Sequence, residues 1–355
     1  MDDSATKNGW FILPETMSDW PWSRHINPHY EEIKAESDAW LKAFEPFNEK
    51  SQLAFDKCDS ALLAALSYPK ASKEHLRTGC DLMNVFFVFD EYTDVESADV
   101  VREMADSVID AITHPDKARP EGEILLGELA RQFWARGIKT CTATSRKQFE
   151  KAFIDYLNSV VEQAADRDNV TIRTVTNYFP NRRENVGARP SFISAILGTD
   201  VPDEAFYHPV VVELSDHIAD LIILDNDLAS YNKEQATGDD RQNILTVVMN
   251  HSGYNLDEAL RWAADYHKDV EALFFDGLKR IPSFGSDVDQ QLQEYIQAIT
   301  MSPRAIYCWN FESGRYFGDK GREIQRTRRV PILPKVVDNH RSLRRQDVVV
   351  PLVAL

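Results

Sequence analysis

The sequence has 355 residues, of which 43% are hydrophobic and 27% charged, a composition typical of a globular protein with one large domain or two smaller ones. It carries 40 Lys and Arg against 57 Asp and Glu, which gives a formal net charge of −17. Because such a negative field repels polyphosphates, the charge argues against nucleic acids and anionic membranes as partners. The same excess of carboxylates suits divalent cations.

No segment is typical of a signal peptide or of a membrane span. The N-terminal sequence MDDSATKNGW is acidic and polar, and apolar runs such as 85–89 are far shorter than the roughly 20 residues that cross a bilayer. The four cysteines, Cys58, Cys80, Cys141 and Cys308, are scattered without a CxxC pair. This argues against a zinc site and favours a reducing, cytoplasmic location.

Apolar residues recur every three, four or seven positions along most of the chain, which is typical of amphipathic helices. In chain order, helices are predicted at 28–44, 51–66, 74–89, 97–112, 121–133, 145–165, 210–231, 256–278, 288–299 and 305–317. No alternating apolar and polar run is bounded by turn signals, so no strand is predicted. The sequence therefore predicts an all-α protein.

Neither a Pro- and Gly-rich linker nor a repeat divides the chain, which favours one helical domain. We assign residues 1–20 to an N-terminal segment, 21–320 to the helical domain and 321–355 to an Arg- and Pro-rich C-terminal tail. Two interpretations of the tail stay open. It either folds against the body as an ordinary terminus, or it closes as a basic lid over an anionic ligand.

The first chemical motif is the acidic run at 90–94, which directly follows the apolar run at 85–89. On a helix, Asp90 lies one turn beyond Phe86 and Phe87, and Asp94 shares its face. An acidic helix end is commonly solvated surface. Here the helix that carries it is apolar on more than one face, which indicates burial, and buried carboxylates usually bind something.

The second motif lies at 226–234, beyond the apolar run at 221–224. Asn226, Ser230 and Glu234 are spaced four apart, so they form one polar stripe on a helix. An amide oxygen, a hydroxyl and a carboxylate are hard donors that suit Mg²⁺, and their combined charge leaves room for an anionic ligand. The alternative is an ordinary exposed helix face.

Two further motifs contain cations. Trp309 precedes Arg315 and Tyr316 near the end of the last predicted helix, where guanidinium and phenol groups are able to donate to phosphate oxygens. The second is the basic stretch at 181–187, in which two arginines are followed by a glycine at a predicted break between helices. Either motif alone is a common surface feature.

In this order, the four motifs resemble those of class I terpene synthases of the fungal sesquiterpene synthase type. The similarity extends from FILPETMSDW to ESGRYFG, which is most of the chain. The family's aspartate-rich motif, D(D/E/N)xxD, matches residues 90–94, its (N/D)Dxx(S/T)xxxE motif matches 226–234, and its Arg-Tyr pair matches 315–316. The resemblance implies a single-domain helical bundle around a central active-site cavity.

The resemblance also implies a Mg²⁺-dependent enzyme that binds three metal ions. Asp90 is expected to bind two of them, and Asn226, Ser230 and Glu234 are expected to hold the third. Asp94 belongs to the same metal-binding group by its motif, although in many relatives it orients neighbouring basic groups and does not touch metal.

The groups that the resemblance assigns to the substrate diphosphate are Lys233, Arg315, Tyr316 and one of Arg182 and Arg183. We favour Arg183 as the sensing arginine. Gly187 then follows four residues later, where the family places a catalytic residue whose carbonyl faces the reacting carbon. Val186 stands where many bacterial relatives have Asp, a departure that weakens this link.

The implied reaction is ionisation of farnesyl diphosphate, loss of diphosphate and cyclisation of the farnesyl cation. Phe86, Phe87 and Trp309 are expected around that cation because ring faces attract positive charge without reacting with it; plain core packing is the alternative for each. Closure of the site is expected to involve residues 235–240 and the tail. The N-terminal and aspartate-rich segments are most similar to the clade that closes farnesyl diphosphate from C1 to C11, which includes the protoilludene synthases.

Three other functions stay open from the sequence. A synthase that releases a linear alcohol such as nerolidol or linalool would carry the same motifs. A chain-elongating prenyltransferase would have a second aspartate-rich motif, which the Asn, Ser and Glu of 226–234 do not supply. The third is a non-catalytic helical binding protein. The expected partner is a prenyl diphosphate, without nucleic acid or membrane insertion, and a monomer and a homodimer are equally compatible with the sequence.

Overall fold

The computed structural model describes residues 9–336 and residue 353. Most of the Arg- and Pro-rich tail that was considered as a lid therefore lies outside the described residues. The helices of the described part are α2 (Tyr30–Lys42), α3 (Glu49–Asp56), α4 (Ser60–Ser67), α5 (Lys73–Thr93), α6 (Ala98–Thr113), α7 (Leu125–Gly137), α8 (Ala143–Asp168), α9 (Val175–Asn185), α10 (Ala188–Ser194), α11 (Asp203–Phe206), α12 (Pro209–Thr237), α13 (Ile244–Ser252), α14 (Leu256–Leu278), α15 (Ser286–Ile299), α16 (Ser302–Glu312) and α17 (Gly321–Thr327). Short 3₁₀ turns η1 (Ile138–Thr140), η2 (Asp240–Gln242) and η3 (Gly318–Lys320) complete the helical part. The all-α prediction is confirmed.

The predicted helix at 51–66 is wrong in one respect, because two helices, α3 and α4, occupy this stretch. The chain turns at Asp59, whose φ of +45° is left-handed, and the Asp59 carboxylate accepts a hydrogen bond from the N–H of Leu62. A side chain that caps a new helix stabilises such a break, and apolar periodicity does not reveal it. Similarly, α16 ends at Glu312 and not at 317, because Ser313 is extended.

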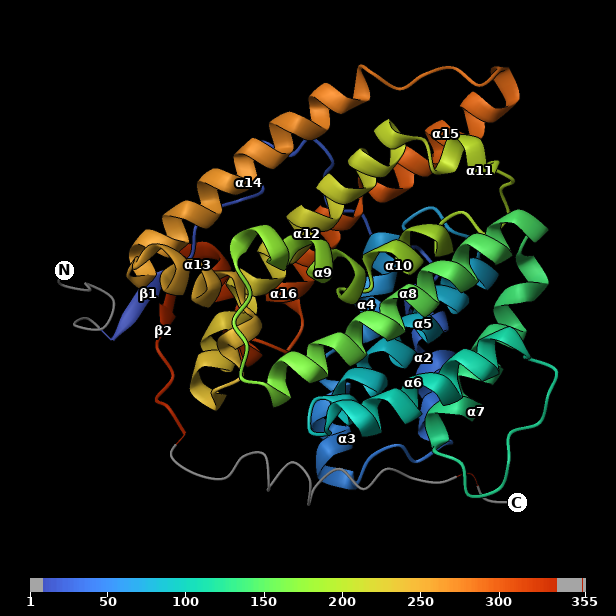
Figure 1. Cartoon of the computed structure of the whole chain (residues 1–355), viewed down its shortest axis with the longest axis horizontal. Helices are drawn as coiled ribbons and strands as arrows, with labels where there is room; N and C mark the ends of the chain where they lie inside the picture. Colours follow the sequence, from blue (N-terminus) through green and yellow to red (C-terminus); the bar gives the residue numbers. More distant parts are fainter. Residues whose placement is uncertain (1–8, 337–352, 354–355) are drawn as a thin grey trace.

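The expectation that the chain contains no strand is also wrong. β1 (Trp10–Ile12) pairs with β2 (Arg329–Pro331) in a two-stranded antiparallel ladder, with Phe11 opposite Val330. Strands of three residues are too short to show an alternating pattern, so the pairing was invisible in the sequence. The ladder joins the start of the described chain to the segment that follows α17, at one side of the molecule (Figure 1).

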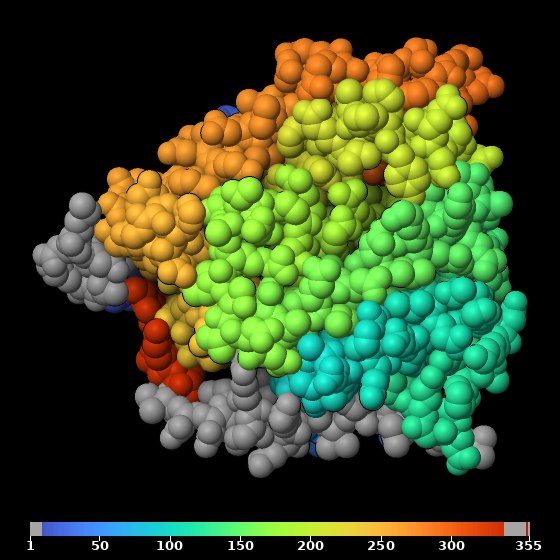
Figure 2. Space-filling model, in the orientation of Figure 1, coloured from blue at the N-terminus to red at the C-terminus, as the bar shows by residue number. Residues whose placement is uncertain are grey.

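The segment before the first helix belongs to the same core as the helices. Phe11, Leu13, Met17 and Trp20 are each at most 3% exposed, and Trp20 packs against the rings of α14. The face seen in Figure 2 is formed largely by the middle of the chain, with α14 along one edge. Within the described residues, no helix combines the length and the apolar character that crossing a membrane requires.

Two long helices bring the predicted motifs into the interior. α12 lies near the centre of the molecule and packs against α14, α16 and α9 (Figure 1). Its residues 217–225 are all buried, as expected for a helix that is apolar on several faces. α5 packs against α2, α4 and α7, and its apolar stretch ends in the acidic motif. The ends of α5 and α12 therefore carry the two acidic motifs from the core to a common cavity.

Candidate active site

A cavity of about 270 Å³ lies between α4, α5, α8, α12 and α16. Apolar side chains form part of its wall, and polar groups from the ends of α5 and α12 also line it. The lining residues include most of the predicted site: Phe86, Phe87, Asp90, Asp94, Gly187, Asn226, Ser230, Lys233, Glu234, Trp309, Arg315 and Tyr316. The fold thus brings all four motifs to one cavity, which was the central expectation of the sequence.

The α12 side of the cavity, called here the α12 rim, consists of Asn226, Ser230 and Glu234. Each of the three side chains has a polar partner from another part of the chain. Arg182 donates to the Asn226 oxygen at 3.0 Å, and the Asn226 amide donates to the Tyr316 hydroxyl at 2.9 Å. Three donors of the type that Mg²⁺ prefers are therefore held on one helix face.

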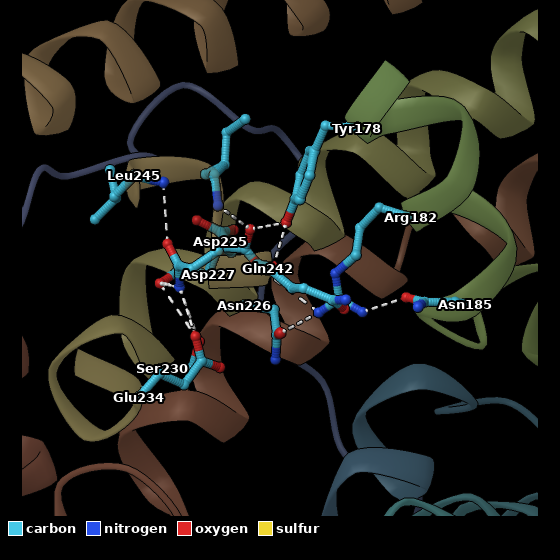
Figure 3. A network of polar contacts seen from close by, with 12 residues as sticks. Tyr178, Arg182, Asn185, Asp225, Asn226, Asp227, Ser230, Glu234, Gln242 and Leu245 are labelled. Atoms are coloured by element: carbon cyan, nitrogen blue, oxygen red, sulfur yellow. Dashed lines mark hydrogen bonds and ion pairs between the residues drawn. The ribbon is translucent and has the colours of Figure 1, made fainter. Parts of the chain in front are cut away.

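Asp227 lies behind the α12 rim, away from the cavity, and links α12 to α9 and α13. Its carboxylate accepts hydrogen bonds from the Tyr178 hydroxyl and from the Ile244 N–H, the latter at 2.8 Å, and lies 3.5 Å from Arg182. Asp227 is 1% exposed and is not part of the cavity lining. Figure 3 shows these groups converging between α9, α12 and the start of α13. Burial raises the pKa of Asp227, and Arg182 and Tyr178 oppose that shift.

Glu234 is the titratable group of the α12 rim. Burial, together with the nearby Asp227 carboxylate, raises the pKa of Glu234 to about 7, and a hydrogen bond from Asn243 opposes the shift. A carboxylate with a raised pKa that faces a cavity is a frequent mark of a functional site. A bound cation would favour its ionised form.

The α5 side of the cavity, called here the α5 rim, consists of Asp90 and Glu91. These carboxylates have fewer direct polar contacts than the side chains of the α12 rim. Arg315 lies 3.4 Å from the Asp90 carboxylate and 3.8 Å from that of Glu91. The same guanidinium lies over the ring of Phe87, 4.7 Å from its centroid. The Asp90 side chain is 45% exposed. The link between the predicted Arg-Tyr pair and the predicted aspartate-rich motif is therefore a direct ion pair.

Asp94 lies close to a basic side chain, as its expected orienting role requires. Arg167 of α8 lies 3.8 Å from the Asp94 carboxylate and donates to the Thr93 carbonyl at 2.7 Å. Arg167 also lines the cavity. The sequence does not point to Arg167, because an arginine near the polar end of a long amphipathic helix carries no local signal of function.

The structure places Arg182, not Arg183, at the cavity, so the preference for Arg183 is not supported. Arg183 forms a two-pronged ion pair with Asp220, at 2.7 and 2.6 Å, and lies 3.2 Å from Asp216. It is not among the cavity-lining residues, whereas Arg182 is. Neighbours on a helix point about 100° apart, so the rotation of α9 decides which of the two arginines faces the cavity. The spacing from Gly187 along the sequence does not show this rotation.

Gly187 lies at the break between α9 and α10, where the sequence predicted one. Its φ of +73° is left-handed, and a Cβ at this position would stand 3.2 Å from the ring of Phe86. Both facts favour glycine. The Gly187 carbonyl accepts a 2.7 Å hydrogen bond from the Ser191 hydroxyl.

The predicted aromatic residues form part of the wall. The rings of Phe87 and Trp309 stack with centroids 5.5 Å apart, and Phe86 packs against Tyr156 of α8 at 4.7 Å. Trp309 donates its indole N–H to the Cys58 carbonyl at 2.8 Å, which fixes the orientation of its ring. Tyr156 also lines the cavity and was not predicted.

The donor set fits divalent metal in its chemistry. Asn226, Ser230 and Glu234 on one rim and Asp90 on the other supply only oxygen ligands, which suit Mg²⁺ better than softer metals. Within the described residues, no group of three or more His, Cys, Asp or Glu side chains is arranged to hold a metal by itself. A metal bound here would therefore also need the amide and hydroxyl ligands of Asn226 and Ser230.

Comparison with known proteins agrees with this arrangement. Residues 81–272 match the family described as terpene synthase family 2, C-terminal metal binding, and this stretch includes both acidic motifs. The chain belongs to the terpene synthase family. It is 66% identical to sesquiterpene synthase 14 of Postia placenta, with 97% of each chain covered. It is also 57% identical to Δ6-protoilludene synthase 18 of the same fungus, over 95% of this chain and 97% of the relative.

A more distant relative and two solved structures extend the comparison of this terpene synthase. The Δ6-protoilludene synthase of Armillaria gallica is 45% identical, over 92% of this chain and 94% of the relative. The crystal structure of an α-eudesmol synthase superposes with a TM-score of 0.75 at 20% identity, over 83% of this chain and 99% of that one. A linalool/nerolidol synthase from Streptomyces clavuligerus gives a TM-score of 0.73 at 21% identity, over 84% and 99%. These structures support the fold assignment alone.

Proposed function

We propose that this terpene synthase is a sesquiterpene cyclase that ionises farnesyl diphosphate, releases diphosphate and closes the farnesyl cation between C1 and C11 to a protoilludene-type hydrocarbon. The observation that carries the proposal is the convergence of Asp90, the α12 rim and the Arg315–Tyr316 pair on one cavity. The 57% identity to a Δ6-protoilludene synthase supports the cyclisation mode.

We assign the metal to the two rims, with Asp90 on one side and Asn226, Ser230 and Glu234 on the other. The family is described by its metal-binding region; the identity of the metal as Mg²⁺ and the number of three ions are part of this proposal. When bound, the metal acts as a Lewis acid that neutralises charge on the departing diphosphate oxygens.

The diphosphate donors in this proposal are Arg182, Lys233, Arg315 and Tyr316, all of which line the cavity. Guanidinium and ammonium groups bind phosphate oxygens through charge-assisted hydrogen bonds. Arg315 pairs with Asp90 at 3.4 Å and Arg182 contacts Asn226 at 3.0 Å. Each arginine is therefore already beside a proposed metal ligand, where substrate and metal would meet.

The cavity wall protects and shapes the cation. Phe86, Phe87, Trp309 and Tyr156 surround part of the space with ring faces and edges. Rings stabilise a nearby positive charge without supplying a nucleophile. An apolar wall also excludes water, which would otherwise capture the cation as an alcohol.

The alternatives drawn from the sequence are not favoured. Relatives that share 45–66% identity are named sesquiterpene or protoilludene synthases, and the second acidic motif retains the Asn, Ser and Glu of a synthase. A non-catalytic binding protein would have no need of this complete set of oxygen donors and cations around one cavity.

The test is incubation of the purified protein with Mg²⁺ and, in separate reactions, geranyl, farnesyl or geranylgeranyl diphosphate, followed by gas chromatography and mass spectrometry. We expect a cyclic sesquiterpene hydrocarbon from farnesyl diphosphate. A linear alcohol as the only product would overturn the cyclisation, and the absence of any product from all three substrates would overturn the synthase assignment.

A further inference from the structure

Asn243 touches two of the proposed metal ligands although it belongs to none of the motifs. It lies between η2 and α13 and is 0% exposed. Its side-chain nitrogen is 2.9 Å from a carboxylate oxygen of Glu234 and 3.3 Å from the Ser230 hydroxyl. It also donates to the carbonyl of Asp227 at 2.8 Å. Asn243 therefore connects the ligand face of α12 to the next helix.

The amide has two hydrogens for these three acceptors. The two shorter contacts, to the Asp227 carbonyl and to Glu234, are the stronger hydrogen bonds, and Ser230 is the weaker third. A carboxylate offers about four acceptor positions. The Asn243 amide occupies one of them, so it orients Glu234 without consuming its capacity to bind a cation.

The orientation of the Asn243 amide is itself determined by its surroundings. Its oxygen accepts a hydrogen bond from the Leu245 N–H at 3.0 Å and so caps the N-terminus of α13. This contact requires an acceptor, so the nitrogen must face α12. The next residue, Ile244, donates its N–H to the Asp227 carboxylate at 2.8 Å. The start of α13 is thus anchored to α12 through the Asn243 side chain and the Ile244 N–H.

We propose that Asn243 is a positioning residue that sets the Glu234 and Ser230 side chains in their metal-binding arrangement before the metal arrives. The proposal rests on the function proposed above. Residues that hydrogen-bond to metal ligands commonly contribute 10- to 100-fold in metal affinity or activity. Asn243 holds one ligand strongly and a second weakly, so the lower end of that range, about 10-fold, is expected.

The test must separate this role from helix capping. Asn243→Ser keeps an oxygen that is able to cap α13, since serine is as good a cap as asparagine, but its side chain is one atom shorter and does not reach Glu234. A matched control is Asn255→Ser. Asn255 caps α14 through a 3.0 Å hydrogen bond from the Glu258 N–H and is not part of the cavity.

The measurement is the melting temperature of the full chain with a fixed concentration of inorganic diphosphate and increasing Mg²⁺. A ligand that binds the native state raises the melting temperature with a midpoint set by its affinity. We expect the Mg²⁺ midpoint of Asn243→Ser to rise about 10-fold and that of Asn255→Ser to stay within about twofold of wild type. Without ligand, Asn255→Ser is expected to stay close to wild type in stability, whereas Asn243→Ser is expected to be less stable because its buried amide also donates to the Asp227 carbonyl.

A second readout is turnover of farnesyl diphosphate against Mg²⁺ concentration, where Asn243→Ser should recover most of its kcat at high Mg²⁺. If its midpoint equals that of wild type and of Asn255→Ser, the positioning role is wrong. If Asn243→Ser does not fold, Asn243→Thr replaces it, because threonine also caps and fills more of the buried space. A wild-type protein that fails to respond to Mg²⁺ and diphosphate would instead contradict the proposed function.

Discussion

The two rims of the cavity are built differently. On the α12 rim, Asn226 and Glu234 each receive a hydrogen bond of 3.0 Å or less from a residue outside α12, and Ser230 is 2% exposed. On the α5 rim, the Asp90 side chain is 45% exposed, and the ion pair that it makes with Arg315 is 3.4 Å long. The fold therefore sets the α12 rim in place, whereas we expect a ligand to complete the more exposed α5 rim.

This difference predicts which rim changes more when substrate binds. A preorganised set of donors costs little reorganisation when a cation binds. At the α5 rim, Arg315 is shared between Asp90 and Glu91, and a diphosphate would compete for the same guanidinium. Substrate binding is thus expected to rearrange the α5 rim more than the α12 rim.

The largest effects are expected from the carboxylate of each rim. Asp90→Ala and Glu234→Ala should each lower turnover of farnesyl diphosphate by at least about 10²-fold, because charge that develops on the leaving group loses stabilisation. Circular dichroism should show an unchanged helical fold for both variants. Normal turnover by either purified variant would overturn the assignment of metal to that rim.

The second prediction compares neighbours on α9. Arg182→Met should lower kcat/KM by about 10²-fold, because a cavity-lining donor is lost. Arg183→Met should instead destabilise the protein by about 3–5 kcal/mol, since it leaves the buried Asp220 without its ion pair. The readouts are steady-state kinetics and melting temperature. The reverse pattern would restore Arg183 as the sensing arginine.

The sequence predicts the site residues that share one helix, but not those that meet only through packing between elements. The stripe of Asn226, Ser230 and Glu234 follows from helical periodicity alone, so it was predicted without tertiary information. The choice between Arg182 and Arg183 depends on how α9 is rotated against α12, and Asn243 reaches Glu234 only because η2 turns the chain back. Such contacts arise from packing between elements, which periodicity does not encode.

The third prediction concerns pH. It tests whether the raised pKa of Glu234 lowers the stability of the metal-free protein as the pH rises. The pKa of Glu234 is raised to about 7, above the value of about 4.3 in an unfolded chain. The native state therefore binds the proton more tightly, and the contribution of Glu234 to stability is lost as pH rises from about 4.5 through 7. Glu234→Gln removes that dependence.

Without metal, Glu234→Gln should melt a few degrees above wild type at pH 8 and close to it at pH 4.5. Mg²⁺ with inorganic diphosphate should reverse the order at pH 8, because only wild type supplies the carboxylate ligand. Thermal melts at a series of pH values provide the measurement. Parallel curves for the two proteins without metal would show that Glu234 does not carry the raised pKa.

The smallest effect is expected at Tyr178, which supports the α12 rim through Asp227. Its hydroxyl has a single proton, and it lies near both the Asp227 carboxylate and the Gln242 carbonyl. The charged acceptor is the stronger one, so Asp227 receives the proton. Tyr178→Phe keeps the ring volume and removes one donor, while the Ile244 N–H at 2.8 Å and Arg182 at 3.5 Å still hold the carboxylate.

Loss of one hydrogen bond to a buried charged group costs about 1.5–3 kcal/mol, so Tyr178→Phe should lower the melting temperature by a few degrees. Turnover should fall less than about tenfold, with KM for farnesyl diphosphate affected more than kcat, because Arg182 would be less well oriented but still present. If Tyr178→Phe instead reduced kcat as strongly as Arg182→Met, the α12 rim would depend on its support as much as on its ligands, and the contrast between a preset rim and a ligand-completed rim would fail.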